Sequence, residues 1–505
     1  MKHRTLIGIA LAFVLAVPLL AQNAPSGPPQ FVSTPILVRV SEQALDHGHF
    51  VFGGDAGVPS PLARGNGAAS YTSAQITAPA LGSGTDRDAS NAPASYEGET
   101  TGAATTLLVG GSNLIYPGNC NAAAAPGTFG DCTVNAYSSA SGASWTRTPL
   151  PRTWNGTTFG ICFDPGLDFD KNGTVYYSYG CAPLSKSFPN AVVVAKSGDG
   201  VNWTKTTPVT FNQGRNFDDK YYLAVDRSNG PFANRVYVSW DRNAGFNQTL
   251  LISFTSDGGA TWTGPIKVND GTSPFERVIG AYPAVDQNSG VVYDSWHDYA
   301  RNIIFVDKST DGGNTWGTDV AAATTHAGFG IDLGCVGGRS QGPAHALKVG
   351  PSGNLYLVYA DAVTNRGFDV LFTRSTDGGA TWSVPVTLND DSGSADQFHP
   401  TISVVAGNGP KDAITVSFYD RRDDANNCFA HVYATKSTNS GVTWSANARQ
   451  TSAASDFDGN PNGPGDYSSS TPFTGQVWPF FCDHRSTNPE TARAGAFEIY
   501  AVDIP

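Results

Sequence analysis

Charged side chains are scarce in this chain of 505 residues, where Asp, Glu, Lys and Arg make up 15%, yet they recur at two kinds of position. One group precedes strand-like segments: Arg215–Lys220, Phe275–Arg277, Arg339–Gln341, Asp396–His399 and Asp466–Tyr467. The other follows strongly aromatic segments: Asp241–Arg242, His297–Asp298, Asp361, Tyr419–Arg422 and Asp483–Arg485. Polar groups that converge on one pocket are the usual form of a functional site.

The chemistry that this inventory fits is glycoside cleavage, which needs an acid and a base or nucleophile, commonly two carboxylates about 5–10 Å apart. The carboxylate candidates are Glu276, Asp219, Asp298 and Asp396. The alternative is structural: Asp420–Arg422 and Asp483–Arg485 are equally consistent with salt bridges between neighbouring units. Likewise His297, His399 and His484 are consistent with hydrogen-bonded loop residues.

A metal site has weaker support. Asp456, Asp458 and Asn460 alternate before a turn, as the ligands of calcium loops do, but the distal Glu of such loops is missing. Calcium is therefore a candidate ligand at this segment, and no cofactor is required by the proposed chemistry. Zinc spacings, the nucleophile-elbow motif, phosphate loops and dinucleotide fingerprints are absent from the sequence.

A repeated polar loop that ends in tryptophan indicates the elements that position these residues. Two clear copies are Ser309–Trp316 and Ser375–Trp382, with the pattern Ser-Thr-Asp-Gly-Gly-x-Thr-Trp. The six tryptophans lie between 54 and 66 residues apart: Trp145, Trp203, Trp262, Trp316, Trp382 and Trp444. A period of this size indicates a repeat architecture. Asp can accept backbone N–H groups in the turn, Gly allows a positive φ, and Trp fills the adjacent apolar layer.

This loop resembles the Asp-box, the repeat signature of sialidases and related bacterial β-propellers, from about Tyr96 to the C-terminus. The resemblance implies a β-propeller that acts on or binds glycans. Sialidases grip a substrate carboxylate with three arginines and use a Tyr activated by Glu. The substrate-binding candidates that this resemblance implies are Arg277, Arg339, Arg421, Arg485, His297 and His399. The further catalytic candidates are Tyr419 and Tyr467, beside Glu276. The Phe/Tyr-Arg-Ile/Leu-Pro motif of sialidases is absent from the sequence.

Each repeat predicts four strands, of which the second is strongly aromatic, as in Val236–Trp240 and Leu355–Tyr359. A seventh unit, residues 463–503, lacks an Asp-box and an outer strand, which we expect residues 35–40 to supply by joining the two termini. The sequence therefore predicts an all-β propeller with seven four-stranded blades, with six as the alternative. In this topology the charged loops share one face. The Asp-boxes lie on the opposite face, so their aspartates are structural: Asp199, Asp257, Asp311 and Asp377.

Residues 1–21 combine Lys2, His3 and Arg4 with an apolar run and predict a signal peptide, hence a secreted or periplasmic protein. Residues 22–95 read as an Ala/Gly/Ser-rich leader with one strand near 35–40, and 96–505 as the propeller domain. The net charge of −12 and the absence of a basic cluster argue against nucleic acid as a partner. No later segment is apolar enough to span a membrane, and we expect a monomer that binds a glycan or polysaccharide.

Seven cysteines in an exported chain predict disulfides. Cys162 and Cys181 bracket two predicted strands, and Cys120 and Cys132 share one irregular loop. Of the remaining three, Cys428–Cys482 is our expected pair, which leaves Cys335.

Three functions fit these observations. The leading hypothesis is an exported sialidase-like glycoside hydrolase that acts on terminal, including anionic, sugars. The first alternative is a propeller that binds glycan or protein without turnover. The second is a polysaccharide lyase that uses Tyr and His with a cation to neutralise a uronate.

Overall fold

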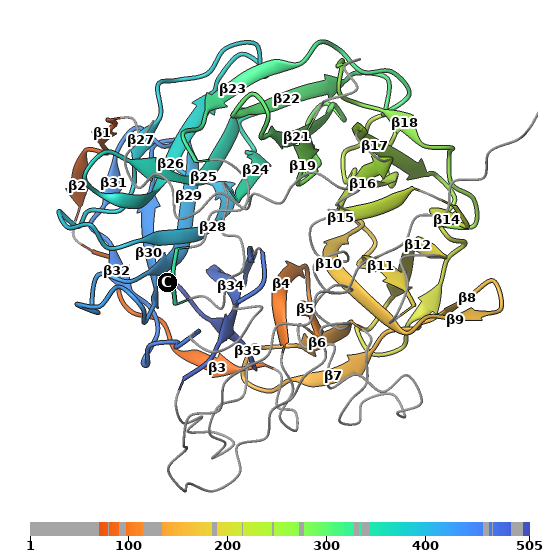
Figure 1. Cartoon of the computed structure of the whole chain (residues 1–505), viewed down its shortest axis with the longest axis horizontal. Helices are drawn as coiled ribbons and strands as arrows, with labels where there is room; N and C mark the ends of the chain where they lie inside the picture. Colours follow the sequence, from red (N-terminus) through yellow and green to blue (C-terminus); the bar gives the residue numbers. More distant parts are fainter. Residues whose placement is uncertain are drawn as a thin grey trace, which may run out of the picture. The chain divides into compact units, whose positions relative to one another are not determined.

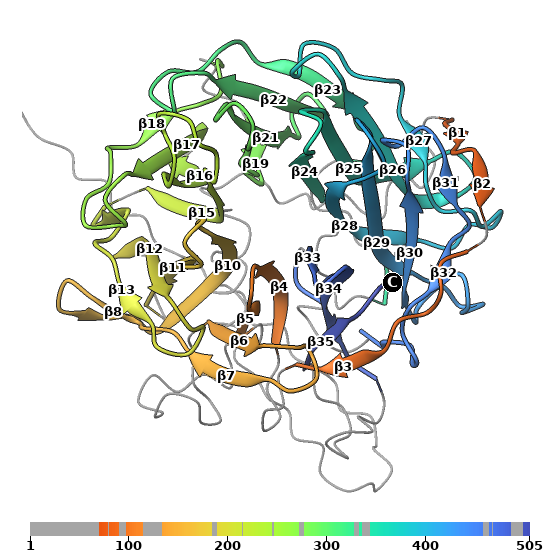
Figure 2. The same ribbon diagram turned by 180° about the vertical axis from the view of Figure 1, so that it is seen from behind.

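The computed structural model describes residues 70–78, 80–89, 97–114, 134–183, 189–214, 216–244, 247–271, 277–327, 333–335, 344–457, 464–466, 468–485 and 498–505. These residues form strands, turns and loops, and no helix occurs among them. Seven antiparallel sheets follow one another around a common axis (Figures 1 and 2). The predicted seven-bladed propeller is confirmed.

Within each blade the strands run in chain order outward from the axis (Figure 1). Blade 1 contains β4 (Glu97–Ala104), β5 (Leu108–Leu114), β6 (Asn135–Ser139) and β7 (Thr146–Pro149). Blade 2 contains β10 (Ile161–Phe169), β11 (Val175–Ala182), β12 (Asn190–Ser197), β13 (Thr204–Lys205) and β14 (Thr210–Asn212). Blade 3 contains β15 (Phe217–Val225), β16 (Val236–Ala244), β17 (Asn247–Thr255) and β18 (Ile266–Lys267). A hairpin of β8 (Thr153–Trp154) and β9 (Thr157–Thr158) connects the first two blades.

The remaining blades repeat this order. Blade 4 contains β19 (Val278–Ile279), β20 (Ala284–Val285), β21 (Val292–Asp298), β22 (Ile303–Ser309) and β23 (Val320–Thr324). Blade 5 contains β24 (His345–Val349), β25 (Leu355–Val363), β26 (Gly367–Ser375) and β27 (Val386–Thr387). Blade 6 contains β28 (Gln397–Ala406), β29 (Asp412–Asp420), β30 (His431–Ser437) and β32 (Ala448–Arg449), and β31 (Trp444–Ser445), between β30 and β32 in the chain, lies outside its four-stranded sheet. Blade 7 contains β33 (Ser469–Phe473), β34 (Gln476–Asp483) and β35 (Glu498–Val502).

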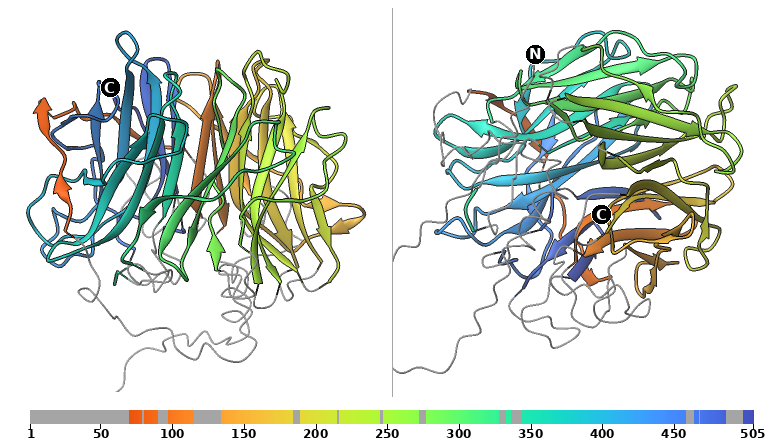
Figure 3. Two further views of the ribbon diagram at one scale, coloured as in Figure 1. Left: turned by 90° about the horizontal axis from the view of Figure 1, so that it is seen from above. Right: turned by 45° about the vertical axis from the view of Figure 1, so that its right-hand side comes forward.

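The aromatic second strands are buried on both faces because each blade is packed between two others. All nine residues of β25 are buried, and side chains such as Trp240 and Trp296 are fully enclosed. β-branched and aromatic residues suit such a two-sided position. The strands run from one face of the ring to the other, with connecting loops at both ends (Figure 3).

The ring is closed by a strand from the N-terminal part of the chain, as predicted, but a different segment supplies it. β3 (Asp86–Asp88) pairs antiparallel with β35 and forms the outer edge of blade 7. The sequence analysis chose residues 35–40 for this place because they are apolar, and they lie outside the described residues. An outer strand faces solvent on one side, so the Asp-Arg-Asp sequence of β3 suits it.

Two more short strands precede β3 and cover neighbouring blade edges. β1 (Thr72–Ser73) pairs parallel with β27 of blade 5, and β2 (Ile76–Ala78) pairs parallel with β31 of blade 6. β1, β2 and β3, which all fall within residues 72–88, therefore lie along the outer edges of three consecutive blades. We call this segment the N-terminal strap.

The disulfides agree in part with the predicted pairs. Cys162 and Cys181 are bonded and sit opposite each other on β10 and β11. Cys428 pairs with Cys335, not with Cys482 as expected, because loops from blades 5 and 6 that are distant in sequence meet on one face. Cys482 is buried, and its carbonyl oxygen accepts a hydrogen bond from Tyr419 at 2.6 Å. Cys120 and Cys132 lie outside the described residues.

The Asp-box loops have the predicted internal bonding. In the copy at Ser309–Trp316, Asp311 Oδ1 accepts the Thr315 backbone N–H at 2.9 Å, and Ser309 Oγ accepts that of Gly313 at 2.7 Å. Hydrogen bonds from the Thr381 hydroxyl and backbone lower the pKa of the equivalent Asp377 to about 2. These aspartates serve the loop, which agrees with the structural role expected from the repeat.

Neighbouring blades are also joined by reciprocal backbone bonds at the rim. Between blades 5 and 6, the Asp390 N–H donates to Asn447 Oδ1 at 3.0 Å, and the Asn447 N–H donates to Asp390 Oδ2 at 2.8 Å. Between blades 3 and 4 the same exchange joins two carboxylates: each of Asp270 and Asp319 accepts the other's N–H, at 3.0–3.1 Å. Burial and the nearby Asp270 raise the pKa of Asp319 to about 7.

Candidate active site

The innermost strands share a distortion near the end where they enter the blade. In β4, β10, β15 and β28 the register shifts within the first few residues. At each shift one residue other than Gly adopts a positive φ of 47–56°: Glu99, Asp164, Lys220 and His399. A bulge of this kind redirects a side chain and is frequent beside functional sites. In blades 1, 2 and 3 it brings Glu99, Asp164 and Lys220 near one another, whereas His399 packs against Phe398 and Tyr419 of its own blade.

Lys220 is the centre of a buried charged cluster. Its side chain is 5% exposed, and its ammonium group pairs with Asp466, which precedes β33. The Lys220 backbone N–H donates to Asp164 Oδ2 at 3.0 Å and to Asp219 Oδ1 at 3.1 Å. Glu99, 1% exposed, adds a further negative charge. We call Glu99, Asp164, Asp219, Lys220, Asp241 and Asp466 the axial cluster.

The cluster places two carboxyl groups side by side. Burial is the main cause that raises the pKa of Asp219 well above its ordinary value, and Asp164 adds to it by charge and by a side-chain hydrogen bond. Burial also raises the pKa of Asp241, the cross-strand partner of Asp219. For Lys220, burial opposes the charge, but Asp164, Asp466, Asp219 and Glu99 together raise its pKa. Burial thus favours the neutral form of Asp219 and Asp241, whereas the surrounding carboxyl groups favour the charged form of Lys220.

Asp218 and Asp219 of β15 make different contacts because successive side chains of a strand point to opposite faces. Asp218 accepts two bonds from the Arg242 guanidinium, at 2.6 and 2.9 Å, and one from Thr210 at 2.8 Å. It ties strands of blades 2 and 3 together. Asp219 points the other way and contributes to the axial cluster.

An aromatic pair lies next to the cluster. Tyr222, two residues beyond Lys220, packs against Tyr282 of blade 4 with ring centroids 4.7 Å apart. Aromatic faces are common platforms for sugar rings because they present apolar area to C–H groups.

Several predicted site residues are held in structural contacts away from the cluster. The Arg421 guanidinium is fully buried, where it donates to the carbonyls of Leu333 and Gly334 at 3.2 and 2.8 Å and pairs with Asp396 at 3.5 Å. Asp396 also accepts from Asn427 at 2.6 Å. These contacts hold the loop that carries the Cys335–Cys428 disulfide.

Arg485 and Asp298 are also engaged. Arg485 is 5% exposed and pairs with Asp86 of the strap at 2.6 Å and with Asp483 at 2.7 Å, so it fastens β3 to blade 7. Asp298 accepts two backbone N–H groups of its own turn and pairs with Arg301 at 2.6 Å. These contacts fit the alternative given in the sequence analysis, in which such residues form structural ion pairs.

Buried aromatic and His candidates have similar settings. Tyr419 donates to the Cys482 carbonyl and stacks on Phe398 with centroids 5.1 Å apart. His297 bonds to Thr325 Oγ1 at 2.9 Å, and burial lowers its pKa to about 3, so it is neutral. His399 lies on a bulge and is 2% exposed. Arg277 directly precedes β19, and its backbone carbonyl accepts the Tyr299 N–H at 2.9 Å.

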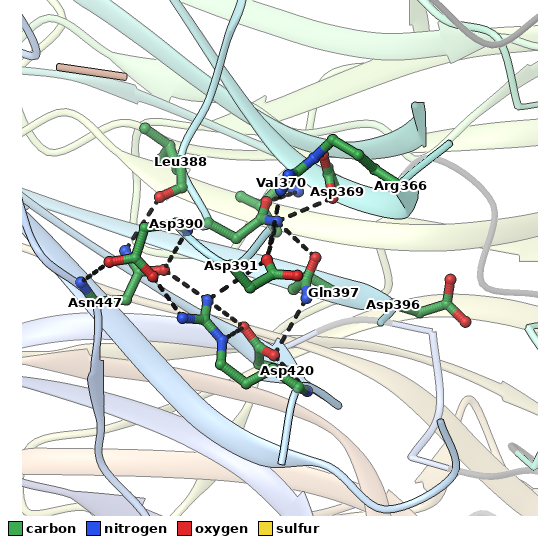
Figure 4. A network of polar contacts seen from close by, with 12 residues as sticks. Arg366, Asp369, Val370, Leu388, Asp390, Asp391, Asp396, Gln397, Asp420 and Asn447 are labelled. Atoms are coloured by element: carbon green, nitrogen blue, oxygen red, sulfur yellow. Dashed lines mark hydrogen bonds and ion pairs between the residues drawn. The ribbon is translucent and has the colours of Figure 1, made fainter. Parts of the chain in front are cut away.

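The charges after the second strand of blade 6 form an inter-blade network (Figure 4). Arg422 pairs with Asp390 at 2.5 Å and with Asp420 at 2.7 Å. Asn389 connects this group to Asp369 at 2.9 Å and to Gln397 at 2.7 Å. Figure 4 shows Asp396 pointing away from the network. The network joins blades 5 and 6 through ion pairs and hydrogen bonds between protein side chains.

Some predictions fall on residues outside the described part of the chain: Glu276, Arg339, Tyr467, Asp458 and Asn460. Asp456 is described, and its N–H donates to the His484 carbonyl at 2.9 Å. Among the described residues no group of three or more His, Cys, Asp or Glu side chains could hold a metal ion. Calcium at residues 456–460 stays a prediction.

Sequence reasoning singled out Asp219, Lys220, Asp241 and Asp466 as polar loop residues but missed Glu99 and Asp164. A local signal existed for Asp164, since Pro165-Gly166 follows it within a strand-like run and such a pair indicates a bulge. Glu99 carries no comparable mark, because Glu97-Gly-Glu99 resembles an ordinary polar loop.

The described residues include no helix with the length and hydrophobicity needed to cross a bilayer. Two disulfides are typical of proteins in oxidising compartments and fit an extracellular or periplasmic location.

Known proteins resemble this chain in structure. Neither a family model nor a curated protein matches the sequence. The chain is similar in structure to an α-L-arabinanase of Penicillium chrysogenum, at 12% identity and a TM-score of 0.44 over 84% of this chain and 99% of that one. It is similar to the Hadza microbial sialidase Hz136, at 16% identity and a TM-score of 0.42 over 74% of each chain. It is also similar to a PL25 ulvan lyase, at 10% identity and a TM-score of 0.43 over 87% of this chain and 96% of that one. Likeness at this level assigns no activity to this chain.

Proposed function

We propose that the protein is an exported glycosidase that releases a terminal sugar from a glycan, with the axial cluster as its catalytic centre. The observation that carries the proposal is geometric: the Lys220 backbone N–H bonds to both Asp164 and Asp219 and so holds two buried carboxyl groups together. Burial raises the pKa of Asp219 well above its ordinary value, which supports a role as an acid. Catalytic acids of glycosidases need a raised pKa to keep their proton at neutral pH, and burial near a second carboxyl is one way to reach it.

In this proposal Asp219 donates its proton to the oxygen of the scissile bond. A second carboxylate, from Glu99 of blade 1 or Asp466 before blade 7, takes a proton from the water whose hydroxyl adds to the anomeric carbon. Lys220 is a positioning residue that holds these carboxylates around one ammonium group. Tyr222 and Tyr282 supply an aromatic face for the sugar ring.

The charge of the cluster favours a neutral sugar over an anionic one. Five carboxyl groups surround a single ammonium, and Lys220 already pairs with Asp466. The sialidase-like clamp for an anionic sugar is not available at Arg421 and Arg485, because carboxylates of the protein pair with both. Uncompensated negative charge in a buried site opposes the entry of a carboxylate.

Release of sugar from a panel of neutral and anionic aryl glycosides tests the proposal. We expect Asp219→Asn to lower kcat about 10²–10⁴-fold, the usual effect of removing a general acid. Asp164→Asn should move the alkaline limb of the pH–rate profile to lower pH, because it removes a neighbouring charge that raises the pKa of Asp219. Asp294→Asn is the matched control: Asp294 is equally buried, with a pKa raised by burial to about 7, but bonds to Ser239 between blades 3 and 4.

Equal loss of activity in Asp219→Asn and Asp294→Asn, both folded, would count against the cluster as the catalytic centre. Saturable glycan binding with no turnover in any protein of the series would establish the binding alternative. An absorbance rise from unsaturated product would indicate the lyase.

A further inference from the structure

At four seams of the ring, the Asp-box loop of one blade docks on the preceding blade through the same contact. A Lys or Arg of the preceding blade donates to the backbone carbonyl of the residue that follows the Asp or Asn of the loop. The four pairs are Lys196 with Gly258 at 2.6 Å, Arg235 with Gly312 at 2.5 Å, Lys308 with Gly378 at 2.8 Å, and Arg374 with Ser440. Blades 2 to 5 thus each bind the next loop with a cation.

The seam between blades 4 and 5 shows what else the docked loop contacts. Gly378 lies against the Lys308 ammonium group and the Tyr293 hydroxyl, and Gly379 lies against the Tyr293 ring and Leu355. Tyr293 faces Lys308 across β21 and β22, and Leu355 begins the second strand of the following blade. The docked turn therefore contacts three positions: a third-strand cation, its cross-strand neighbour, and the start of the next second strand.

The same three positions surround a cavity of about 270 Å³ between blades 6 and 7, which we call the seam cavity. Lys436 is the third-strand cation, Thr415 faces it across β29 and β30, and Val477 lies near the start of β34. Residues 498–505 contain no Asp-box. Thr415 is also smaller than the tyrosines at the equivalent position of blades 2 to 5, which are Tyr176, Tyr237, Tyr293 and Tyr356.

Lys436 makes a long hydrogen bond in place of the contact with a docked loop. The residue is partly exposed, and its ammonium group donates to the Pro505 carbonyl at 3.4 Å. The equivalent bonds of Lys196 and Lys308 measure 2.6 and 2.8 Å. Since hydrogen bonds weaken with distance, an oxygen acceptor that enters the seam cavity can replace the Pro505 carbonyl.

We propose that the seam cavity binds a tight Asp-Gly or Asn-Gly turn of a partner polypeptide. The backbone carbonyl that follows the Asp or Asn accepts the bond from Lys436, and the turn glycine packs against Thr415 and Val477. The cavity volume falls just below the range of about 300–1,000 Å³ usual for small-molecule pockets, which suits the tip of a turn. The proposal does not depend on the proposed function, because these residues lie outside the axial cluster.

The test is titration calorimetry of the full-length protein with a peptide of the sequence of residues 375–382, closed into a ring so that the turn is preformed. We expect saturable binding at submillimolar concentration. The same ring with Asp377→Ala should bind severalfold more weakly, because Asp377 accepts the Thr381 N–H at 2.9 Å and the Thr381 hydroxyl at 2.5 Å and so holds the turn in shape.

Two variants of the protein test the site itself. Lys436→Met should weaken binding about tenfold, the effect of one lost hydrogen bond to a charged group. Ala413→Trp fills the cavity from its wall and should abolish binding while the cation remains. Lys411→Met, at an exposed lysine of the same blade that does not line the cavity, is the matched control and should bind like the wild type. Thermal unfolding of each variant establishes that it is folded.

Asp219→Asn separates this proposal from the catalytic one, because it should abolish turnover and leave peptide binding unchanged. Three results would overturn the seam site: no heat with the ring peptide at millimolar concentration, equal affinity for the Asp377→Ala ring, or unchanged binding in folded Lys436→Met and Ala413→Trp.

Discussion

Replacement of Asp319 by Asn should stabilise the protein at alkaline pH and have little effect at acidic pH. Asp270 and Asp319 exchange hydrogen bonds between backbone N–H and carboxylate across the seam between blades 3 and 4, and the charge of Asp270 helps to raise the pKa of Asp319. Asp307 adds a third negative charge, and burial raises its pKa to about 6. The matching seam between blades 5 and 6 has Asn447 in place of the second carboxylate.

The size of the effect follows from the pKa of Asp319, which rises from 3.8 to about 7. Because the folded-state pKa exceeds the unfolded-state value, the folded protein binds the proton more tightly. The associated stability is present below about pH 4 and is lost as pH rises through about 7. A three-unit shift corresponds to about 4 kcal/mol, and screening of this partly exposed group reduces it to about 1–2 kcal/mol.

Calorimetric unfolding at pH 8 and pH 5 measures the difference. Asp319→Asn should raise Tm by about 1–4 °C at pH 8 and by less than about 1 °C at pH 5. Asn447→Asp is the reciprocal variant, and its pH dependence should be smaller because the Arg422 guanidinium donates to residue 447 at 2.8 Å. An equal Tm change at both pH values, or a lower Tm at pH 8, would refute the argument from carboxylate repulsion.

Three other predictions concern the N-terminal strap, the packing between blades 1 and 7, and the buried ion pair of Arg421. Deletion of residues 1–90 removes the strap and exposes three blade edges. It should therefore lower Tm by more than about 10 °C or cause aggregation that size-exclusion chromatography detects. Deletion of residues 1–69 retains the strap and should leave Tm and the elution profile near those of the wild type. Gly110→Ala places a Cβ 2.3 Å from Cε1 of the Phe480 ring in blade 7 and should lower the free energy of unfolding by about 1–3 kcal/mol in urea titration. Restoration by Phe480→Leu would verify the clash, and an unaffected single variant would contradict it. Arg421→Met should lower the free energy of unfolding by about 3–5 kcal/mol, since it leaves a buried carboxylate unpaired; a raised KM with unchanged stability would instead favour a substrate clamp.

The repeated strands and their order could be predicted because their determinants are local. The aromatic runs 236–240 and 355–359 fall within β16 and β25, and the Asp-box loops bond internally as their sequence requires. The outer strands of the strap could not be predicted this way. Short polar strands such as Asp86–Asp88 carry little local preference and form because an unpaired edge is present.

The same distinction between local and long-range determinants applies to the candidate site. Polar loop residues could be recognised as a group, but whether a given side chain meets a ligand or a partner residue depends on strands distant in sequence. Arg421 meets the carbonyls of residues 333 and 334, and Arg485 meets Asp86, almost 400 positions away. Nothing near either arginine in the sequence indicates these contacts.

The sequence by itself determined the blade period, the strand pattern, the face on which each loop lies and the structural role of the Asp-box aspartates, because turn chemistry and strand alternation act over a few residues. The tertiary structure alone decided which charges gather at the axis. Bulges in separate blades turn Glu99, Asp164 and Lys220 toward one another, and the carboxyl groups gathered there raise the pKa of Lys220 against the effect of burial. Burial and charge coupling depend on closure of the whole ring, which no local stretch of sequence encodes.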